Sequence, residues 1–214
     1  QTDMFMAKFR GVSMVALIFV IACTSKNKNP AVPASEITEA DGESRPNFVI
    51  ILTDDQGYQD IGCFGSPDID TPYLDKMAAE GMKFTSFYAQ TICGPSRAAL
   101  MTGSYPTRVA TKWNHDLEQE HHPRMHDREI TIAEVLAKVG YTTAAFGKWD
   151  LAGHSQTEYE VDLLPTRQGF DLFFGTSTSN DAFVNLLRGE KIIERNADLS
   201  TLTRRYTDEA IQFM

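Results

Sequence analysis

Hydrophobic positions recur along the chain in short runs that glycine, proline and charged residues separate, a pattern typical of strands alternating with helices. The continuous apolar run at 46–52 is rich in β-branched residues and predicts a strand buried on both faces in a parallel sheet. The runs at 82–88 and 141–146 predict two further strands, and 182–193 predicts a hairpin. These segments make up the strands of one predicted sheet.

Capping residues and glycines delimit the predicted helices. Residues 70–81 begin with a capping candidate and an early proline and end at a glycine. Thr131 and Glu134 have capping-box spacing before a helix that Gly140 ends, and 203–214 predicts a last helix. Strands alternating with helices predict an α/β fold with a mostly parallel central sheet flanked by helices.

The N-terminus has the pattern of an export signal. Basic residues precede an apolar run at 12–22 that is too short to span a bilayer, so we expect residues 1–23 to form a signal peptide. Val20-Ile21-Ala22-Cys23 resembles a bacterial lipobox, which predicts lipidation at Cys23 and an exported lipoprotein of the periplasm or outer membrane. A plain secretory signal with an incidental Cys23 is the alternative. The polar segment 24–44 is predicted to be a flexible linker, followed by an ordered domain at 45–214.

Composition narrows the classes of partner. The chain has 214 residues with 42% apolar content, enough for one sizeable core. Its net charge of −9 argues against nucleic acid as a partner, because a phosphate backbone calls for a basic face. We expect a membrane contact only through the lipid anchor. Histidines and a tryptophan at 113–126 fit no established zinc spacing and predict an exposed loop at the rim of a pocket.

Charged residues follow two of the predicted strands. Asp54 and Asp55 come directly after the first strand, where open α/β sheets bind ligands, and carboxylate oxygens suit hard cations. A solvated turn is the alternative interpretation of this pair. Lys148, followed by Trp149 and Asp150, lies in the same way after the strand at 141–146.

Cys93 lies where a helix should begin. Pro95 suits the first turn, and Gly103 follows an apolar, alanine-rich run as a plausible stop. A side chain at this position meets the positive end of the helix dipole, so an anion is favoured in front of it, and Arg97 shares its face one turn later. The alternatives are a buried small apolar residue or a disulfide with Cys63.

The block Cys-x-Pro-Ser-Arg at 93–97, followed by Ala-Ala-Leu-Met-Thr-Gly, resembles the signature of the type I sulfatases of the alkaline phosphatase superfamily. The resemblance implies that a maturation enzyme oxidises Cys93 to formylglycine (3-oxoalanine), the nucleophile. It further implies that Asp54, Asp55 and the modified Cys93 bind calcium, with magnesium as the alternative metal. Arg97 would steady the formylglycine hydrate and Lys148 would hold sulfate.

The chain departs from the family pattern at two places. Asp150 stands where the family usually has histidine, and His154 is out of register with it. Asn180 stands near the place of another histidine and could donate a hydrogen bond to sulfate, although it cannot act as a general acid. The resemblance covers 45–214, which would be the N-terminal part of a catalytic domain truncated before its end.

The function implied is hydrolysis of sulfate esters of aryl groups or carbohydrates, with a sulfated small molecule or glycan as substrate. Two alternatives stay open: a phosphatase or phosphonate hydrolase of the same superfamily, and a non-catalytic lipoprotein that binds sulfated glycans. We expect the fragment alone to lack activity, because a metal ligand found later in the family's sequences lies beyond this segment.

Overall fold

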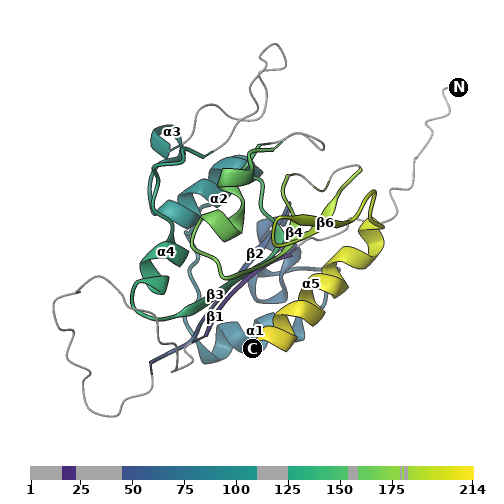
Figure 1. The fold of residues 1–214 in the computed structure, drawn as a ribbon. Helices are drawn as coiled ribbons and strands as arrows, with labels where there is room; N and C mark the ends of the chain where they lie inside the picture. Colours follow the sequence, from purple (N-terminus) through teal and green to yellow (C-terminus); the bar gives the residue numbers. More distant parts are fainter. Residues whose placement is uncertain (1–15, 23–44, 110–124, 154–158, 179, 181–182) are drawn as a thin grey trace, which may run out of the picture.

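The computed structural model describes residues 16–22, 45–109, 125–153, 159–178, 180 and 183–214 (Figure 1). The strands are β1 (Ala16–Ala22), β2 (Phe48–Thr53), β3 (Thr142–Lys148), β4 (Leu172–Thr176), β5 (Leu186–Arg188) and β6 (Lys191–Glu194). The α-helices are α1 (Pro72–Glu80), α2 (Cys93–Thr102), α3 (Pro106–Val109), α4 (Ile132–Ala137) and α5 (Leu199–Phe213). Short 3-10 helices lie at η1 (Tyr58–Asp60), η2 (Gly62–Phe64), η3 (Val161–Leu163) and η4 (Pro165–Arg167).

The described strands form one mixed sheet in the order β2-β1-β3-β4-β5-β6. Neighbours pair antiparallel except β3 and β4, which pair in parallel. Because β1 is antiparallel to both β2 and β3, the strands β2, β3, β4 and β6 still run in one direction. The α/β class is thus confirmed. The carboxyl ends of β2, β3 and β4 all lie at the same end of the strands, on one side of the molecule.

Two hydrophobic cores lie on the two faces of the sheet. Ala145 of β3 belongs to the core shared with α2 and α4, whereas Ala144 and Phe146 belong to the core under α5 (Figure 1). This division follows from the strand period of two, which sends successive side chains to opposite faces. The β3–β4 pair is also close: a Cβ on Gly175 would lie 1.9 Å from the carbonyl oxygen of Gly147. The strand β3, which leads to Lys148, is therefore packed on both faces.

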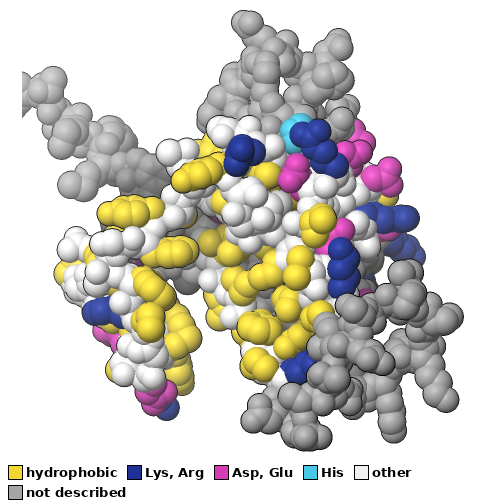
Figure 2. Space-filling view, turned by 90° about the vertical axis from the view of Figure 1, so that its left-hand side faces the viewer, with side chains coloured by type: hydrophobic (Ala, Val, Ile, Leu, Met, Phe, Trp, Pro, Cys, Tyr) yellow, Lys and Arg dark blue, Asp and Glu magenta, His cyan; other side chains and the backbone are white. Residues whose placement is uncertain are grey.

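Two strand predictions were wrong in detail. β2 is the edge strand of the described sheet and is half exposed, with only Ile50 and Leu52 packed against a core, so it is not buried on both faces. Residues 82–88 form no strand, and Phe84 and Phe87 are exposed. The apolar and polar residues of this segment alternate, but no neighbouring strand pairs with it in the described structure. Hydrophobic side chains gather on the face drawn in Figure 2, and apolar surface of this kind marks an interaction site or an aggregation liability.

The run at 16–22 forms β1, which lies between β2 and β3 in the described structure. The interpretation of residues 1–23 as a cleaved leader stays a prediction, since the pairing of an uncleaved chain does not test cleavage. Cys23 and the linker at 24–44 lie outside the described residues. No helix in the described ranges has both the length and the apolar character needed to cross a membrane.

The helix and hairpin predictions are confirmed with shifted ends. The capping box of α4 is present: the Thr131 hydroxyl accepts from the Glu134 N–H at 3.2 Å, and the Glu134 carboxylate accepts from the Thr131 N–H at 2.7 Å. The hairpin is β5 and β6, joined at Gly189, where φ is 59°. The last helix begins earlier than predicted because Asp198 caps it by accepting a hydrogen bond from the Ser200 N–H.

Candidate active site

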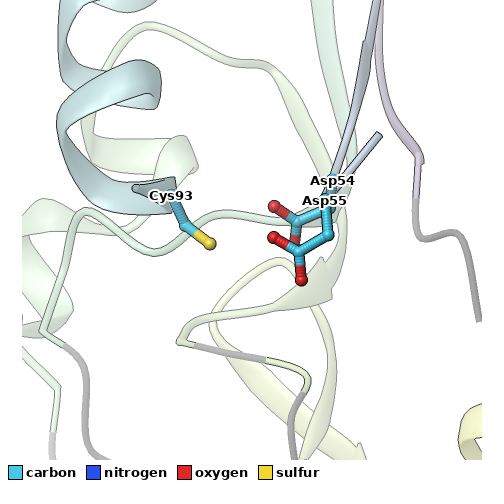
Figure 3. A group of neighbouring side chains, drawn as sticks. All are labelled: Asp54, Asp55 and Cys93. Carbon is cyan, nitrogen blue, oxygen red and sulfur yellow. The ribbon is translucent and has the colours of Figure 1, made fainter. Parts of the chain in front are cut away.

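Three predicted site residues converge where β2 ends and α2 begins. Asp54 and Asp55 follow Thr53, the last residue of β2, and Cys93 is the first residue of α2. The thiol of Cys93 points toward the two carboxylates (Figure 3). Ligand atoms of the three side chains all lie within 4.8 Å of one another. The prediction of a helix beginning at Cys93 is confirmed, and Gly103 ends it with φ at 64°.

These residues open onto a pocket of about 240 Å³. It lies between the end of β2, the segment before α2 and the first turn of α2. The lining consists of Leu52, Thr53, Asp54, Asp55, Gln56, Ala89, Gln90, Thr91, Ile92, Cys93, Ser96 and Arg97. The polar lining combines hydroxyl and amide residues with the charged residues Asp54, Asp55 and Arg97. A small polar or anionic group fits such a wall better than a large apolar one.

A buried ionic network lies behind the pocket. The Lys148 ammonium is 3.0 Å from Asp54 Oδ2 and 3.8 Å from Asp150 Oδ2. Arg97 Nη2 is 3.5 Å from Asp54 Oδ1, and Arg97 Nη1 donates to the Lys148 carbonyl at 2.5 Å. Lys148 and Arg97 are almost fully buried. Two cations and two carboxylates therefore neutralise one another beside the pocket, as buried charges require.

The network shifts the pKa values of its members. Burial alone would raise the pKa of Asp54, but the nearby Arg97 and Lys148 cations outweigh it, so the pKa lies below its usual value. Burial alone would lower the pKa of Lys148, but Asp150 and Asp54 outweigh it and the pKa is raised. Asp54 is thus held as a carboxylate and Lys148 as an ammonium ion.

The surroundings of Cys93 disfavour the thiolate form of its side chain. Burial raises the pKa of its thiol, and Asp54 adds to that rise, although Lys148 acts in the opposite direction. A neutral thiol is a weak nucleophile and a weak ligand. Cys63 and Cys93 are both free, so the disulfide alternative is wrong. The unmodified side chain at position 93 is therefore poorly suited to nucleophilic chemistry.

The acidic pair fits a hard divalent cation. Calcium and magnesium take oxygen ligands, and Asp54 and Asp55 present carboxylates at the same point. The thiol sulfur of Cys93 is the wrong donor for such an ion, whereas oxygen on the same carbon would be the right one. The donor set suits calcium or magnesium once Cys93 carries oxygen, and it offers further ligand positions to substrate or water.

The structure separates Asn180 from the pocket. Its amide oxygen accepts from the Thr176 hydroxyl at 2.7 Å, and Thr176 pairs in register with Lys148 across β3 and β4. Asn180 is buried, and its Nδ2 has no hydrogen-bond partner within the described residues. It is not among the residues that line the pocket. His154 and the candidate loop with Trp113, His115, His121 and His122 lie outside the described residues.

Sequence reasoning missed how the loop before α2 is held. The Ser96 hydroxyl lies 2.8 Å from the Ile92 carbonyl and accepts from the Gln90 N–H at 3.1 Å. This fixes residues 90–92, which form one wall of the pocket. A serine in the first turn of a helix often bonds to nearby backbone, and that preference was the available signal. The ion pair between Lys148 and Asp150 was the other omission, because only the folded structure shows that both side chains are buried against each other.

Comparison with known proteins assigns the family. The Sulfatase family model matches residues 46–214, which is more than half of the chain. The chain belongs to the sulfatase family. This sulfatase segment is 42% identical to mouse arylsulfatase J over 63% of the chain, and 44% identical to human arylsulfatase A over 64% of it. It is 36% identical to mouse N-acetylgalactosamine-6-sulfatase over 90% of the chain.

The structural match agrees with the sequence matches. The crystal structure of Ps i-CgsB in complex with k-i-k-neocarrahexaose is similar to this chain, with 28% sequence identity and a TM-score of 0.62. The match covers 75% of this chain and 39% of that one. The chain spans 21%, 26% and 41% of the length of the three sulfatases named above. The described sulfatase fold is therefore only part of what these relatives contain.

Proposed function

We propose that the protein carrying this chain hydrolyses sulfate esters, with Cys93 matured to formylglycine beside a calcium ion. The observation that carries the proposal is the convergence of Cys93, Asp54 and Asp55 within 4.8 Å at one pocket, in a chain of the sulfatase family. Family membership alone leaves the site residues unassigned. Their common position supports giving the nucleophile role to Cys93 and the ligand roles to the two aspartates.

The chemistry follows from the charge of the substrate. A sulfate ester is anionic, and fixed positive groups aimed at the reacting oxygens lower the barrier to attack. Arg97 lines the pocket and supplies one positive charge there, and its buried Nε has no hydrogen-bond partner in the described part of the chain. Lys148 supplies a second positive charge next to Asp54. Arg97 would contact the sulfate group at the pocket, whereas Lys148, which is fully buried and not among the lining residues, would attract it through its charge.

A calcium ion and the formylglycine modification would supply two functions that the encoded side chains lack, a Lewis acid and a hydroxyl nucleophile. A calcium ion held by Asp54 and Asp55 supplies Lewis-acid polarisation of a hydroxyl at position 93. Formylglycine supplies, as its hydrate, a hydroxyl nucleophile where the encoded thiol has a raised pKa and stays neutral. Asp54 fits its ligand role because its lowered pKa keeps it ionised.

We favour a sulfated carbohydrate as substrate. The pocket lining contains hydroxyl and amide groups from Thr53, Gln56, Gln90 and Thr91, with no aromatic side chain among the described lining residues. Such groups bind sugar hydroxyls, whereas a flat aryl group gains more from an aromatic wall. The structural neighbour was crystallised with k-i-k-neocarrahexaose. The hydrogen bond from Asn180 to the sulfate group stays a prediction, because Asn180 is not among the residues that line the pocket.

Export and maturation complete the proposal. A basic start, a short apolar run and the lipobox-like residues 20–23 support an exported lipoprotein anchored at Cys23. A formylglycine-generating enzyme would read the segment around Cys93 before folding, because Pro95 and Arg97 are buried afterwards. The partners are thus the maturation enzyme, a sulfated glycan and a membrane reached through lipid.

Mass spectrometry of the residue at position 93 tests the proposal. In full-length protein from a host with the maturation enzyme, the Cys93 peptide should carry an aldehyde that reacts with hydrazide, and the protein should release sulfate from a sulfated oligosaccharide. Cys93→Ala should lack both. Cys63→Ala is the matched control, since Cys63 is free and outside the pocket, and should keep both.

Three results would count against it. An unmodified Cys93 thiol in a preparation that cleaves sulfate esters would show that the nucleophile is elsewhere. Faster hydrolysis of an aryl phosphate than of an aryl sulfate would favour a phosphatase. Binding of sulfated glycan without turnover, with unmodified Cys93, would favour a lipoprotein that only binds.

A further inference from the structure

The carboxylate of Asp150 lies in a place that the proposed reaction does not explain. Asp150 is 4% exposed, and its Oδ2 is 3.8 Å from the Lys148 ammonium. Among the described aspartates and glutamates, only Asp150 is buried. A carboxylate rarely lies in a protein interior unless it is paired with a cation, so the Lys148–Asp150 pair requires an account of its own.

Asp150 is rigidly placed relative to Lys148. Trp149, between the two, is fully buried and donates from its indole N–H to the Leu163 carbonyl at 2.7 Å. The Asp150 backbone has φ at 57°, and its N–H donates to the Ser177 carbonyl at 3.2 Å. Aspartate and asparagine tolerate this left-handed conformation better than other side chains. The hydrogen bonds of Trp149 to Leu163 and of the Asp150 N–H to Ser177 therefore fix the position of Asp150.

The charges around Lys148 are balanced by two different carboxylates. Asp54 Oδ2 is 3.0 Å from the ammonium and is also a candidate metal ligand, whereas Asp150 lies outside the candidate ligand group. A divalent cation bound through Asp54 competes with Lys148 for that carboxylate. Without Asp150, the fully buried ammonium would then have no carboxylate partner among the described residues, which is costly in a protein interior.

We propose that Asp150 is a positioning residue that holds the Lys148 ammonium and so frees Asp54 for a divalent cation. This inference rests on the proposed function for the identity of the metal and substrate. It gives Asp54 and Asp150 separate tasks: one carboxylate serves the cation, and the other holds the Lys148 side chain in place.

The first test compares calcium affinity in full-length wild type and Asp150→Asn by isothermal titration calorimetry. Asparagine keeps the left-handed backbone and removes only the charge. We expect calcium binding about tenfold weaker, a typical coupling between neighbouring charged groups. Asp171→Asn is the matched control, because Asp171 accepts a hydrogen bond from the Thr143 N–H at 2.8 Å. Thr143 lies near the start of β3, at the other end of the strand from Lys148. The calcium affinity of Asp171→Asn should equal that of wild type.

A double-mutant cycle separates action through Lys148 from a general structural role. Adding Asp150→Asn to Lys148→Met should leave calcium affinity unchanged within about twofold, since the competing ammonium is already gone. The sulfatase activity of Asp150→Asn should fall at limiting calcium and return at saturating calcium. A merely unstable variant would not recover in this way.

Equal calcium affinity in wild type and Asp150→Asn would overturn the proposal, and so would the same loss in the Lys148→Met background. Wild-type protein that binds calcium but releases no sulfate would overturn the proposed function, while the calcium affinities would still decide the role of Asp150.

Discussion

Replacing Asp54 with asparagine tests the ionic network without any metal. In calcium-free buffer the change removes the carboxylate that lies 3.0 Å from Lys148 and 3.5 Å from Arg97. Removing one partner of a buried ion pair costs about 3–5 kcal/mol. We expect the lower end, about 3 kcal/mol, because the Asp54 side chain is 16% exposed and Lys148 keeps Asp150.

The assay is thermal unfolding of wild type and Asp54→Asn in the presence of a chelator. For a domain of this size, about 1 kcal/mol shifts Tm by roughly 2–4 °C, so the expected fall is roughly 6–12 °C. Asp55→Asn is the matched control, because Asp55 is exposed and makes no ion pair in the described structure. It should keep the wild-type Tm without calcium, although both variants should lose calcium binding and sulfatase activity.

The pH dependence adds a second check. The pKa of Asp54 in the folded protein lies below its ordinary value of 3.8, so folding favours the ionised form. Its contribution is therefore fully present above the unfolded value and is lost as pH falls through the folded value. The stability gap between wild type and Asp54→Asn should be constant from pH 7 to about pH 5 and shrink below about pH 4. A variant as stable as wild type at pH 7, or a gap that widens in acid, would refute the reasoning.

Two further predictions concern the anchor and the sheet. Cells given labelled palmitate should incorporate label into wild type and not into Cys23→Ala, and equal labelling of the two would contradict the lipoprotein interpretation. Gly175→Ala should lower Tm by more than Thr131→Ala, because its Cβ would lie 1.9 Å from the Gly147 carbonyl oxygen, whereas loss of the Thr131 cap costs about 0.5–2 kcal/mol. If Gly175→Ala melts at the wild-type temperature, β3 and β4 are not as close as described.

Local features were predictable because they depend on neighbouring residues. The start of α2 at Cys93 and its end at Gly103 follow from proline and glycine preferences, and the capping box of α4 follows from the spacing of Thr131 and Glu134. The position of Asp54 directly after a strand was an equally local inference. A single stretch of chain determines each of these through its own backbone preferences.

Tertiary structure decided what depends on distant segments. The sequence pattern of 46–52 predicted a central strand, but pairing leaves β2 at the edge of the described sheet, because burial depends on the neighbours a strand receives. The alternation of 82–88 formed no strand for the same reason. Asp54 and Lys148 are 94 residues apart, and only the parallel directions of β2 and β3 bring them within 3.0 Å.

The sequence thus determined which chemical groups are available to the site, because short segments determine the residue types and the ends of helices and strands. The folded structure alone decided which of those groups meet. Asp150 shows the difference: its sequence position suggested only a departure from a familiar pattern, whereas its burial against Lys148 depends on packing around Trp149 and the end of β4. Charged side chains that would be solvated in an unfolded chain become partners when the protein interior leaves them no water.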